Sequence, residues 1–541
     1  MRANTPVLDF LRSCNPRLCT LVEMKMTIRT TLLASLLLAS FAAPATAAAP
    51  GATGAAKAPG EVAIKTAKYA VTTYRKDLVD TLAKLVSYNT VADPAVPSDK
   101  NPVHIAFKEA LKLEAQRLGL DYADHGWTVI IGLGSASERV GVITHGDVQP
   151  VDASKWKKSP FVLDRTSEPG KLLARGAEDD KGPIATALYA MKSIRDRGVP
   201  LSKRIELYVY MGEESDWGPL TEFLKTHQPP QVNITLDAEY PAVTAEKGSG
   251  TIAVTVPKLG AASAPAGEPY VAEFGGGFFR TQIPEDATAL VANATPQLEQ
   301  AVRARAAQQE GMQYSYAWQG SSLAIKARGV SAHSSKPEYG VNAVSMLADA
   351  LAVRPWVNTT AGGVVNFLNE MVGTGLHGEK FGSIAYRDGF MGPMTFSPTV
   401  IRQRKEEEGG GIEVSINLRR PQGKSTEQLT GEINAALAQW QARQLPLANV
   451  TVRINEPWIQ KSAPHLPTLM SVFSYFTGMK NPQPVAIGGG TNSRLFPGAV
   501  SFGPGMPGKV YTGHSEHEFI TEKQLLLNLQ MYTAVLVELA K

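Results

Sequence analysis

The stretch Val140-Gly141-Val142-Ile143-Thr144-His145-Gly146-Asp147 decides the fold, because a short apolar run ends there directly in histidine and aspartate. Similar apolar runs occupy residues 205–210 and 232–236. Residues 183–197 predict a helix with proline in its first turn. Buried strands that alternate with helices are typical of an α/β fold with many parallel strand pairs. The sequence therefore predicts an α/β domain around this stretch.

The flanking segments extend this pattern and then change it. Apolar residues at helical spacing predict helices at about residues 65–85 and 105–118. In the middle of the chain, residues 323–328 and 412–419 alternate apolar with polar side chains, which is typical of strands with one solvated face. Helices are expected near these strands. We interpret this middle part as an α+β domain inserted into the α/β domain.

The expected fold is thus an α/β domain with a mixed, mainly parallel sheet, plus an inserted α+β domain, the lid. The helices expected in the lid lie at residues 343–353 and 426–443. The expected domain organisation is a signal peptide at residues 1–47, a flexible lead-in at 48–64, the α/β domain from 65–247 and 457–541, and the lid domain at 248–456.

The N-terminal region predicts export. Lys25 and Arg29 precede the apolar run Leu32 to Ala43, and Ala45-Thr46-Ala47 supplies the small residues of a cleavage site. A membrane-spanning helix needs about 20 apolar residues, whereas Pro44 interrupts this shorter run. We expect a periplasmic or secreted protein without stable membrane insertion. The alternative of a membrane anchor fits the run less well, and the start of translation is left open between Met1, Met24 and Met26.

Composition excludes several classes of protein. The chain has 541 residues, of which 43% are hydrophobic, so it can bury at least two cores and is not disordered. The only two cysteines, Cys14 and Cys19, precede the apolar run, which excludes a disulfide scaffold in the exported protein. The net charge is +4, and residues 1–47 hold five basic and two acidic residues, so the remainder is nearly neutral. We expect no nucleic-acid partner.

Residues that can bind metals recur where the predicted strands end. Open α/β sheets place their sites at the carboxyl ends of strands, so these clusters are expected to meet at one edge. Singly, each residue has an ordinary explanation, such as a helix cap or a solvated surface group. The recurrence favours a site instead. The clusters are His145-Gly146-Asp147, Glu178-Asp179-Asp180, Glu213-Glu214, Asp237 and His514-Ser515-Glu516-His517-Glu518.

A ligand set of histidine and carboxylate without cysteine suits zinc or another first-row divalent ion. The number of carboxylates predicts two ions, because neighbouring metals share a bridging carboxylate and a bridging water. We therefore expect two divalent metal ions as cofactors, with zinc as the expected metal.

These motifs resemble those of metallopeptidase family twenty, which holds aminoacylases, glutamate carboxypeptidases, carnosinases and bacterial Xaa-His dipeptidases. The likeness covers the chain after residue 65 and is closest to the PepV-type Xaa-His dipeptidases, through Asp179-Asp180-Lys181-Gly182-Pro183 and Glu246-Lys247-Gly248. The resemblance implies that Asp179 bridges both metals, that Glu213 is the general base and that Asp147 orients a ligand histidine. The metal ligands that it implies are His145, Asp179, Glu214, Asp237 and His514. It gives no role to Glu178, Asp180 and His517, which are expected at the surface or behind the ligands.

In the lid, the resemblance implies that His333 stabilises the oxyanion and that Arg419 holds the substrate carboxylate, with Arg420 as an alternative. Gly490 and Thr491 belong to a glycine-rich segment that resembles a substrate-binding loop. One position departs from the family pattern, because Thr281 occupies the place where relatives usually have asparagine.

The expected function is hydrolysis of the peptide bond of small dipeptides by a metal-bridging water, in an exported metallopeptidase. A deacylase of N-acyl amino acids or a glutamate carboxypeptidase of the same family is the first alternative. A solute-binding protein without catalysis is the second, but Glu213 and the bridging Asp179 are both present. The long lid predicts a monomer, since relatives that dimerise through the lid generally have a shorter one.

Overall fold

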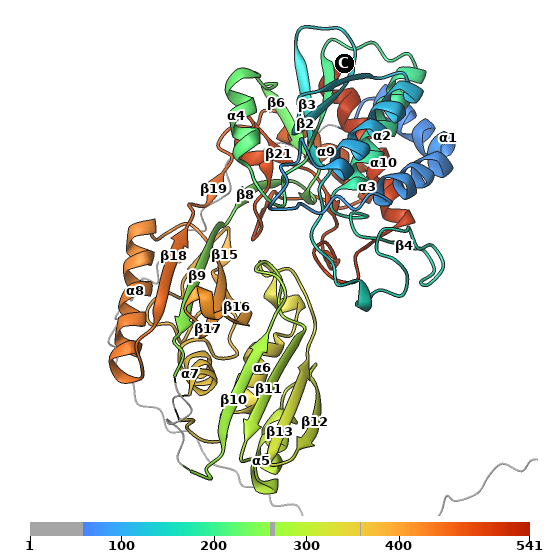
Figure 1. Ribbon diagram of the computed structural model, residues 1–541. Coiled ribbons are helices and arrows are strands. Elements are labelled where there is room, and N and C mark those ends of the chain that lie inside the picture. Colours follow the sequence, from blue (N-terminus) through green and yellow to red (C-terminus); the bar gives the residue numbers. More distant parts are fainter. Residues whose placement is uncertain (1–57, 260–265, 358) are drawn as a thin grey trace, which may run out of the picture. The chain divides into compact units, whose positions relative to one another are not determined.

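The computed structural model describes residues 58–259, 266–357 and 359–541 (Figure 1). The predicted signal peptide and residues 48–57 of the predicted lead-in lie outside these ranges. Helix α1 (Glu61–Val86) begins before residue 65, so it takes in the end of the predicted lead-in. No helix within the described ranges is both long enough and apolar enough to cross a membrane.

The first sheet is mixed and has the strand order β1-β2-β5-β3-β6-β21-β8-β19, with β20 paired to β8. Parallel pairs join β5, β3, β6 and β21 at its centre, and antiparallel pairs lie toward both ends. The predicted α/β class is confirmed. The strands are β1 (Asp121–Asp124), β2 (Thr128–Leu133), β3 (Arg139–His145), β5 (Arg204–Tyr210), β6 (Val232–Thr235), β8 (Val243–Glu246), β19 (Trp458–Ile459), β20 (Val485–Ile487) and β21 (Val500–Ser501).

Helices cover both faces of this sheet. Successive side chains of a strand point to opposite faces, so one strand contributes to the core on each side. Val140 and Val142 of β3 join a large apolar core with one set of helices, whereas Ile143 joins a smaller core with α4 and η6. Figure 1 shows the first set packed together beside the sheet. It comprises α1, α2 (Pro102–Leu118), α3 (Lys181–Asp196), α9 (Leu466–Thr477) and α10 (Glu522–Ala540). The second set is α4 (Gly218–Thr226) and η6 (Asn492–Leu495).

The boundaries of α2 follow from local chemistry. The side chain of Asn101 accepts hydrogen bonds from the backbone N–H groups of Val103 and His104, and Pro102 is the first helical residue. Both features satisfy or remove N–H groups that lack a partner within the helix. Gly119 ends the helix with φ 70°, in the left-handed region that glycine adopts without strain.

The second sheet is antiparallel throughout and has the order β12-β13-β11-β10-β16-β17-β9-β18. Four helices pack on it around a separate apolar core. The strands are β9 (Gly248–Val256), β10 (Tyr270–Gly276), β11 (Asp286–Ala292), β12 (Gln313–Gln319), β13 (Ser322–Arg328), β16 (Thr395–Gln403), β17 (Ile412–Arg420) and β18 (Ala448–Ile454). The helices are α5 (Pro296–Ala306), α6 (Ala343–Ala350), α7 (Thr360–Phe367) and α8 (Thr426–Arg443).

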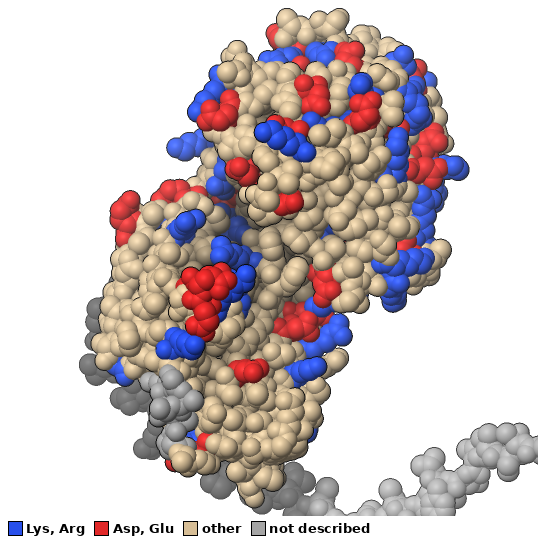
Figure 2. Space-filling view, in the orientation of Figure 1, with Lys and Arg blue, Asp and Glu red and all other residues tan. Residues whose placement is uncertain are grey.

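Short elements complete the described chain. They are η1 (Ala153–Lys155), β4 (Lys171–Leu173), β7 (Ala238–Glu239), η3 (Pro337–Tyr339), η4 (Leu368–Val372), β14 (Arg387–Asp388), β15 (Gly392–Pro393), η5 (Glu406–Glu408), β22 (Pro504–Gly505) and β23 (Phe519–Thr521). On the face drawn in Figure 2, basic and acidic side chains are interspersed.

Strand β17 differs from its prediction. The alternation in β13 is real, with buried apolar residues between more exposed polar ones, but every residue of β17 is buried. The expected solvated face is therefore wrong for β17. Its polar side chains are covered by partners: Arg402 binds Glu413 at 2.8 Å, and Ser334 donates to the Oδ1 of Asn417 at 3.0 Å. The alternation of polar and apolar residues in β17 therefore reflects a layer of buried polar side chains and not a face exposed to water.

The chain passes between the sheets at two adjacent points. It leaves the first sheet after β8 and enters the second with β9, and it returns between β18 and β19. At Gly248, an added Cβ would lie only 2.1 Å from the carbonyl oxygen of Asn455, so the outgoing and returning segments are in contact. Glycine is required where two backbones approach this closely.

Burial of His465 makes stability dependent on pH. Its Nε2 donates to the carbonyl oxygen of Asn233 at 3.1 Å, and burial lowers its pKa from 6.5 to about 4. A lowered folded-state pKa means that the stabilising contribution is complete above pH 6.5 and is lost as the pH falls through 4. The expected loss is about 3 kcal/mol.

We expect the melting temperature to fall less between pH 7 and pH 4.5 in His465→Gln than in the wild type, because the amide still donates to Asn233 but cannot titrate. Thermal unfolding of both proteins across this range measures the difference. An identical pH dependence in the two proteins would contradict the assignment.

Candidate active site

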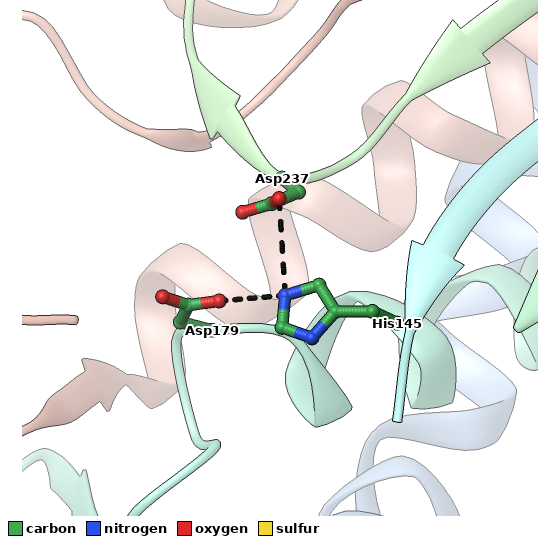
Figure 3. A group of neighbouring side chains, drawn as sticks. All are labelled: His145, Asp179 and Asp237. Carbon is green, nitrogen blue, oxygen red and sulfur yellow. Dashed lines mark hydrogen bonds and ion pairs between the residues drawn. The ribbon is translucent and has the colours of Figure 1, made fainter. Parts of the chain in front are cut away.

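The first group of possible metal ligands lies at the end of β3. His145 is buried, and its Nε2 is 2.8 Å from Oδ1 of Asp179 and 3.8 Å from Oδ2 of Asp237 (Figure 3). Asp237 follows β6, which pairs in parallel with β3, so two adjacent strand ends deliver this group. Figure 3 shows the two carboxylates converging on one ring nitrogen.

The second group shares Asp179 with the first. The Nε2 of His514 is 3.2 Å from the other oxygen of Asp179, Oδ2, and 2.9 Å from Oε1 of Glu214. Within each group the candidate ligand atoms lie within 4.8 Å of one another. All five predicted ligands are therefore brought together. The two oxygens of one carboxylate face two different donor groups, as a bridging ligand requires.

The protonation of these groups reflects their crowding. Burial alone would lower the pKa of His145, but its contacts with Asp147 and Asp179 raise that pKa well above the usual range. Burial also opposes the charged form of His514, whereas Glu214 and Asp179 raise its pKa to about 10. The pKa of Asp237 is raised well above its usual range by burial and by the charge of Asp179. A site that concentrates carboxylates and imidazoles in this way is suited to bound cations.

Asp147 contributes differently from the prediction. The Nδ1 of His145 lies 3.0 Å from the backbone carbonyl oxygen of Asp147 and 3.6 Å from its carboxylate. The two carboxylate oxygens accept instead from the backbone N–H groups of Glu213 and Glu214, at 3.0 and 3.1 Å. Asp147 therefore orients His145 mainly through its backbone and fixes the glutamate turn through its side chain.

Buried acids hold the backbone around Asp179. Glu518 is fully buried, and its Oε1 accepts from the N–H groups of Glu178 and Asp179 at 2.9 and 3.0 Å. Its Oε2 binds the buried guanidinium of Arg175 at 2.7 Å. Pairing of this kind is required to keep a buried carboxylate charged. The loop that carries Asp179 is therefore held from the C-terminal part of the chain.

The three neighbours without an assigned role lie where they were expected, behind the ligands or at the surface. The carboxylate of Glu178 accepts from the N–H and the Oγ1 of Thr512, both at 2.6 Å. Asp180 makes no cap for α3 and accepts from the N–H of His145 at 3.1 Å. His517 is exposed and contacts Glu168 at 2.5 Å.

A hollow opens onto both donor groups. It is lined by Asp179, Glu213, Glu214, Asp237, Ala238, Glu239, His333, Ser335, Lys336, Ile487, Gly489, Gly490, Thr491, Tyr511 and His514.

Glu213 enters this pocket with an uncommitted carboxylate. Its Oε1 is buried and has no hydrogen-bond partner among the described residues. Burial, and then the charge of Asp237, raises the pKa of Glu213 well above its usual range. A raised pKa is the property of a carboxylate that accepts a proton near neutral pH.

His333 also lines the pocket, and its ring centroid lies 4.8 Å from that of His514. The N–H of Ser335 donates to Nδ1 of His333 at 3.1 Å. The neutral ring therefore carries its hydrogen on Nε2. Burial, and then the charges of His514 and Arg419, lowers the pKa of His333 well below its usual range, so the ring is a neutral donor.

The two arginines at the end of β17 have different environments. Arg420 is bound to Thr426 at 2.9 Å, to Glu456 at 3.3 Å and to the carbonyl oxygen of Lys424. Arg419 is buried, and the hydrogen bond found for it goes to Asn417 at 3.3 Å. Arg419 is not one of the residues that line the pocket, but its charge lowers the pKa of His333. The guanidinium of Arg419 therefore keeps more N–H donors available to a ligand than that of Arg420.

The glycine-rich loop is anchored from behind. Gly490 and Thr491 both line the pocket. The N–H and the Oγ1 of Thr491 donate to one oxygen of the buried Glu246, at 3.1 and 2.7 Å, and Arg494 binds the other oxygen at 2.8 Å. The N–H and the hydroxyl of Thr491 thus already have an acceptor in Glu246.

The departure at Thr281 has a visible consequence. Its Oγ1 is buried without a partner among the described residues, and Thr281 does not line the pocket. The neighbouring Gln282 places its amide nitrogen 3.3 Å from the carbonyl oxygen of His514. Thr281 therefore supplies no polar group to the pocket.

Tyr511 was not singled out from the sequence. Its hydroxyl donates to Oδ2 of Asp179 at 2.6 Å, and its ring lines the pocket. Its place, three residues before His514, was the only available signal, because a tyrosine in a loop is usually structural. Glu239 and Lys336 also line the pocket, and they were not singled out from the sequence.

The fold and the paired donor groups define a class of hydrolase, and comparison with known proteins identifies it. Residues 141–538 match the family model described as Peptidase family M20/M25/M40. This match covers more than half of the chain, so the protein belongs to that peptidase family. The resemblance predicted from the motifs is confirmed.

Individual relatives extend over nearly the whole fold. A relative from Staphylococcus haemolyticus is 30% identical, over 87% of this chain and 99% of its own length. The Beta-Ala-Xaa dipeptidase of Lactobacillus delbrueckii subsp. lactis is 29% identical, over 82% of this chain and 91% of its own. Human carnosine dipeptidase 1 has a similar fold, with a TM-score of 0.52 at 15% identity, covering 89% of this chain and 99% of that one.

Proposed function

We propose that this protein is an exported dipeptidase that uses two divalent metal ions, with zinc as the expected metal. The single observation that carries the proposal is the position of Asp179, whose two oxygens face the two donor groups beside the unpartnered carboxylate of Glu213. The relative named as a Beta-Ala-Xaa dipeptidase supports the choice of dipeptides.

The donor set fits two such ions. His145 and Asp237 would hold one ion, Glu214 and His514 the other, and Asp179 would contact both. Nitrogen and carboxylate oxygen donors without cysteine are suited to zinc. Bound there, two divalent ions would polarise the scissile carbonyl group and lower the pKa of the attacking water.

The residues of the chain supply the remaining steps. Glu213 accepts a proton from the attacking water and passes it to the leaving amine, which its free Oε1 and raised pKa support. His333 presents the hydrogen on its Nε2 to the carbonyl oxygen as negative charge develops there. The carboxylate of Asp147 fixes the turn of Glu213 and Glu214 by accepting from their backbone N–H groups.

The substrate carboxylate is assigned to Arg419. Among the described residues, the buried guanidinium of Arg419 has one hydrogen bond, at 3.3 Å, so it retains donors for a carboxylate ligand. Arg420, the alternative, is already held by three acceptors. The glycine-rich loop at Gly490 lines the pocket on the side of Glu246, whose charge also acts on Arg419.

The alternatives within the family are a deacylase of N-acyl amino acids and a glutamate carboxypeptidase. A solute-binding role without catalysis would not require the uncommitted carboxylate of Glu213. A monomer is supported by His333, which lines the pocket from within the same chain.

The proposed metal and proton roles can be separated by two variants. Glu213→Gln is expected to bind two metal ions and to lose about 10²–10⁴ in kcat, because an amide cannot accept the proton. Asp179→Asn is expected to bind less metal, because only one of its oxygens remains. Metal content and dipeptide turnover should be measured together, with the exposed Glu222→Gln as the control. Near-normal turnover by Glu213→Gln would refute its role as base.

Arg419 should make the enzyme require a free substrate C-terminus. A guanidinium forms paired bonds to a carboxylate that a neutral amide cannot match. We expect the wild type to prefer a dipeptide over its C-terminal amide by about 30-fold or more. Arg419→Ala should lose most of this preference in kcat/KM. Equal discrimination by both enzymes would show that another group holds the carboxylate.

Export should yield a mature protein that starts near Ala48. The basis is the apolar run at residues 32–43, followed by Ala45-Thr46-Ala47. N-terminal sequencing of the protein recovered outside the cytoplasm measures the start. Recovery there of a chain that still carries Lys25 would contradict cleavage at this site.

A further inference from the structure

One carboxylate in the pocket has no part in the proposed chemistry. Five carboxylates line the pocket, of which three are proposed metal ligands and Glu213 is the proposed base. Glu239 is the fifth. Its side chain is partly buried, with 24% exposed. A charged group in a pocket of this kind requires a partner of opposite charge.

The backbone of Glu239 is fixed beside the proposed metal ligand Asp237. Strand β7, which carries Glu239, pairs in parallel with β22. A Cβ added to Gly505 of β22 would lie 3.1 Å from the Cγ of Glu239, so glycine at this position leaves room for the glutamate side chain. The carboxylate is therefore placed by regular structure at the wall of the pocket.

A primary ammonium group already occupies this carboxylate. The Nζ of Lys336 forms an ion pair with Oε1 of Glu239. Lys336 also lines the pocket, and its side chain is 21% exposed. It belongs to the same short loop as His333, since the N–H of Lys336 donates to the carbonyl oxygen of His333 at 2.9 Å. The pocket thus binds an ammonium group close to the groups that would act on the peptide bond.

We propose that Glu239 binds the free N-terminal ammonium group of the substrate, which displaces Lys336. This inference rests on the proposed dipeptidase function. An unblocked dipeptide carries one ammonium and one carboxylate, and Arg419 is assigned to the carboxylate. Glu239 is the carboxylate left for the opposite end, and it already holds the same chemical group in Lys336.

The assignment defines the substrate class. Dipeptides with a free amino group can form the ion pair with Glu239, whereas N-acyl amino acids lack the charge and leave Glu239 with Lys336. The pocket then selects dipeptides over the substrates of a deacylase. A merely structural ion pair between the segments that carry β7 and η3 would give no such selection.

The test compares a dipeptide such as alanyl-alanine with propionyl-alanine, which has the same shape but lacks the amino group. Both are assayed with the wild type, Glu239→Gln and Lys336→Met. The matched control is Glu285→Gln, since Glu285 also pairs with a lysine, Lys155, at 3.0 Å, but lies outside this pocket. Each kcat and KM is measured separately at a fixed metal concentration.

We expect Glu239→Gln to lower kcat/KM for alanyl-alanine by about 10- to 100-fold, mainly through KM, and to change propionyl-alanine by less than about threefold. Lys336→Met should lower the KM of alanyl-alanine, because a competing ammonium is removed. Glu285→Gln should change neither substrate by more than about threefold.

Equal losses on both substrates in Glu239→Gln would overturn the inference, because they indicate a structural role. A rise in the KM of alanyl-alanine in Lys336→Met would also overturn it, since Lys336 would then bind substrate itself. If the wild type prefers propionyl-alanine, the proposed dipeptidase function fails. If the wild type prefers alanyl-alanine and Glu239→Gln keeps that preference, only the role of Glu239 fails.

Discussion

The carboxylate of Asp179 must face two donor groups at once, and much of the surrounding structure serves that requirement. Its oxygens lie 2.8 Å from His145 and 3.2 Å from His514, residues that are far apart in the chain. Such a carboxylate can be placed only if its backbone is held. Glu518 supplies two acceptor contacts to that backbone and is itself paired with the buried Arg175. A single buried ion pair therefore links the C-terminal segment to the centre of the site.

The second constraint is the point where the chain passes between the two sheets. Gly248 begins β9, and no side chain fits there because the returning segment at Asn455 lies against it. Two residues before this glycine, Glu246 is fully buried and binds Thr491 of the glycine-rich loop and Arg494 of η6. The connection between the sheets and the wall of the pocket are therefore built from the same few residues.

The strand ends could be predicted because strand and ligand signals coincide in the sequence. His145 and Asp237 follow apolar runs that are too short for helices, and parallel pairing brings their ends together. Hydrogen-bond partners could not be predicted in the same way. The engagement of Thr491 by Glu246 and the contact of Tyr511 with Asp179 join residues that are hundreds of positions apart. Neither pair leaves a local pattern in the sequence.

Burial was misjudged in β17 for a related physical reason. Polar residues that alternate with apolar ones indicate one polar face, but they do not distinguish water from a layer of polar partners. In β17 that layer contains Asn417, which accepts from Ser334, a residue on the loop of His333. A strand that carries groups toward a site can therefore have the same alternation as a strand at the surface.

The two adjacent arginines of β17 have different roles: Arg420 is structural, and Arg419 is assigned to the substrate. Successive side chains of a strand point to opposite faces, so Arg419 and Arg420 cannot share an environment. Arg420 is held by Thr426, by Glu456 and by a backbone carbonyl, close to where the chain returns to the first sheet. Arg419 lies on the same face as Asn417 and donates to it at 3.3 Å. A buried guanidinium costs free energy unless its donors are satisfied. Burial lowers the pKa of Arg419 to about 10, so the group is still charged at neutral pH and is available to a carboxylate ligand.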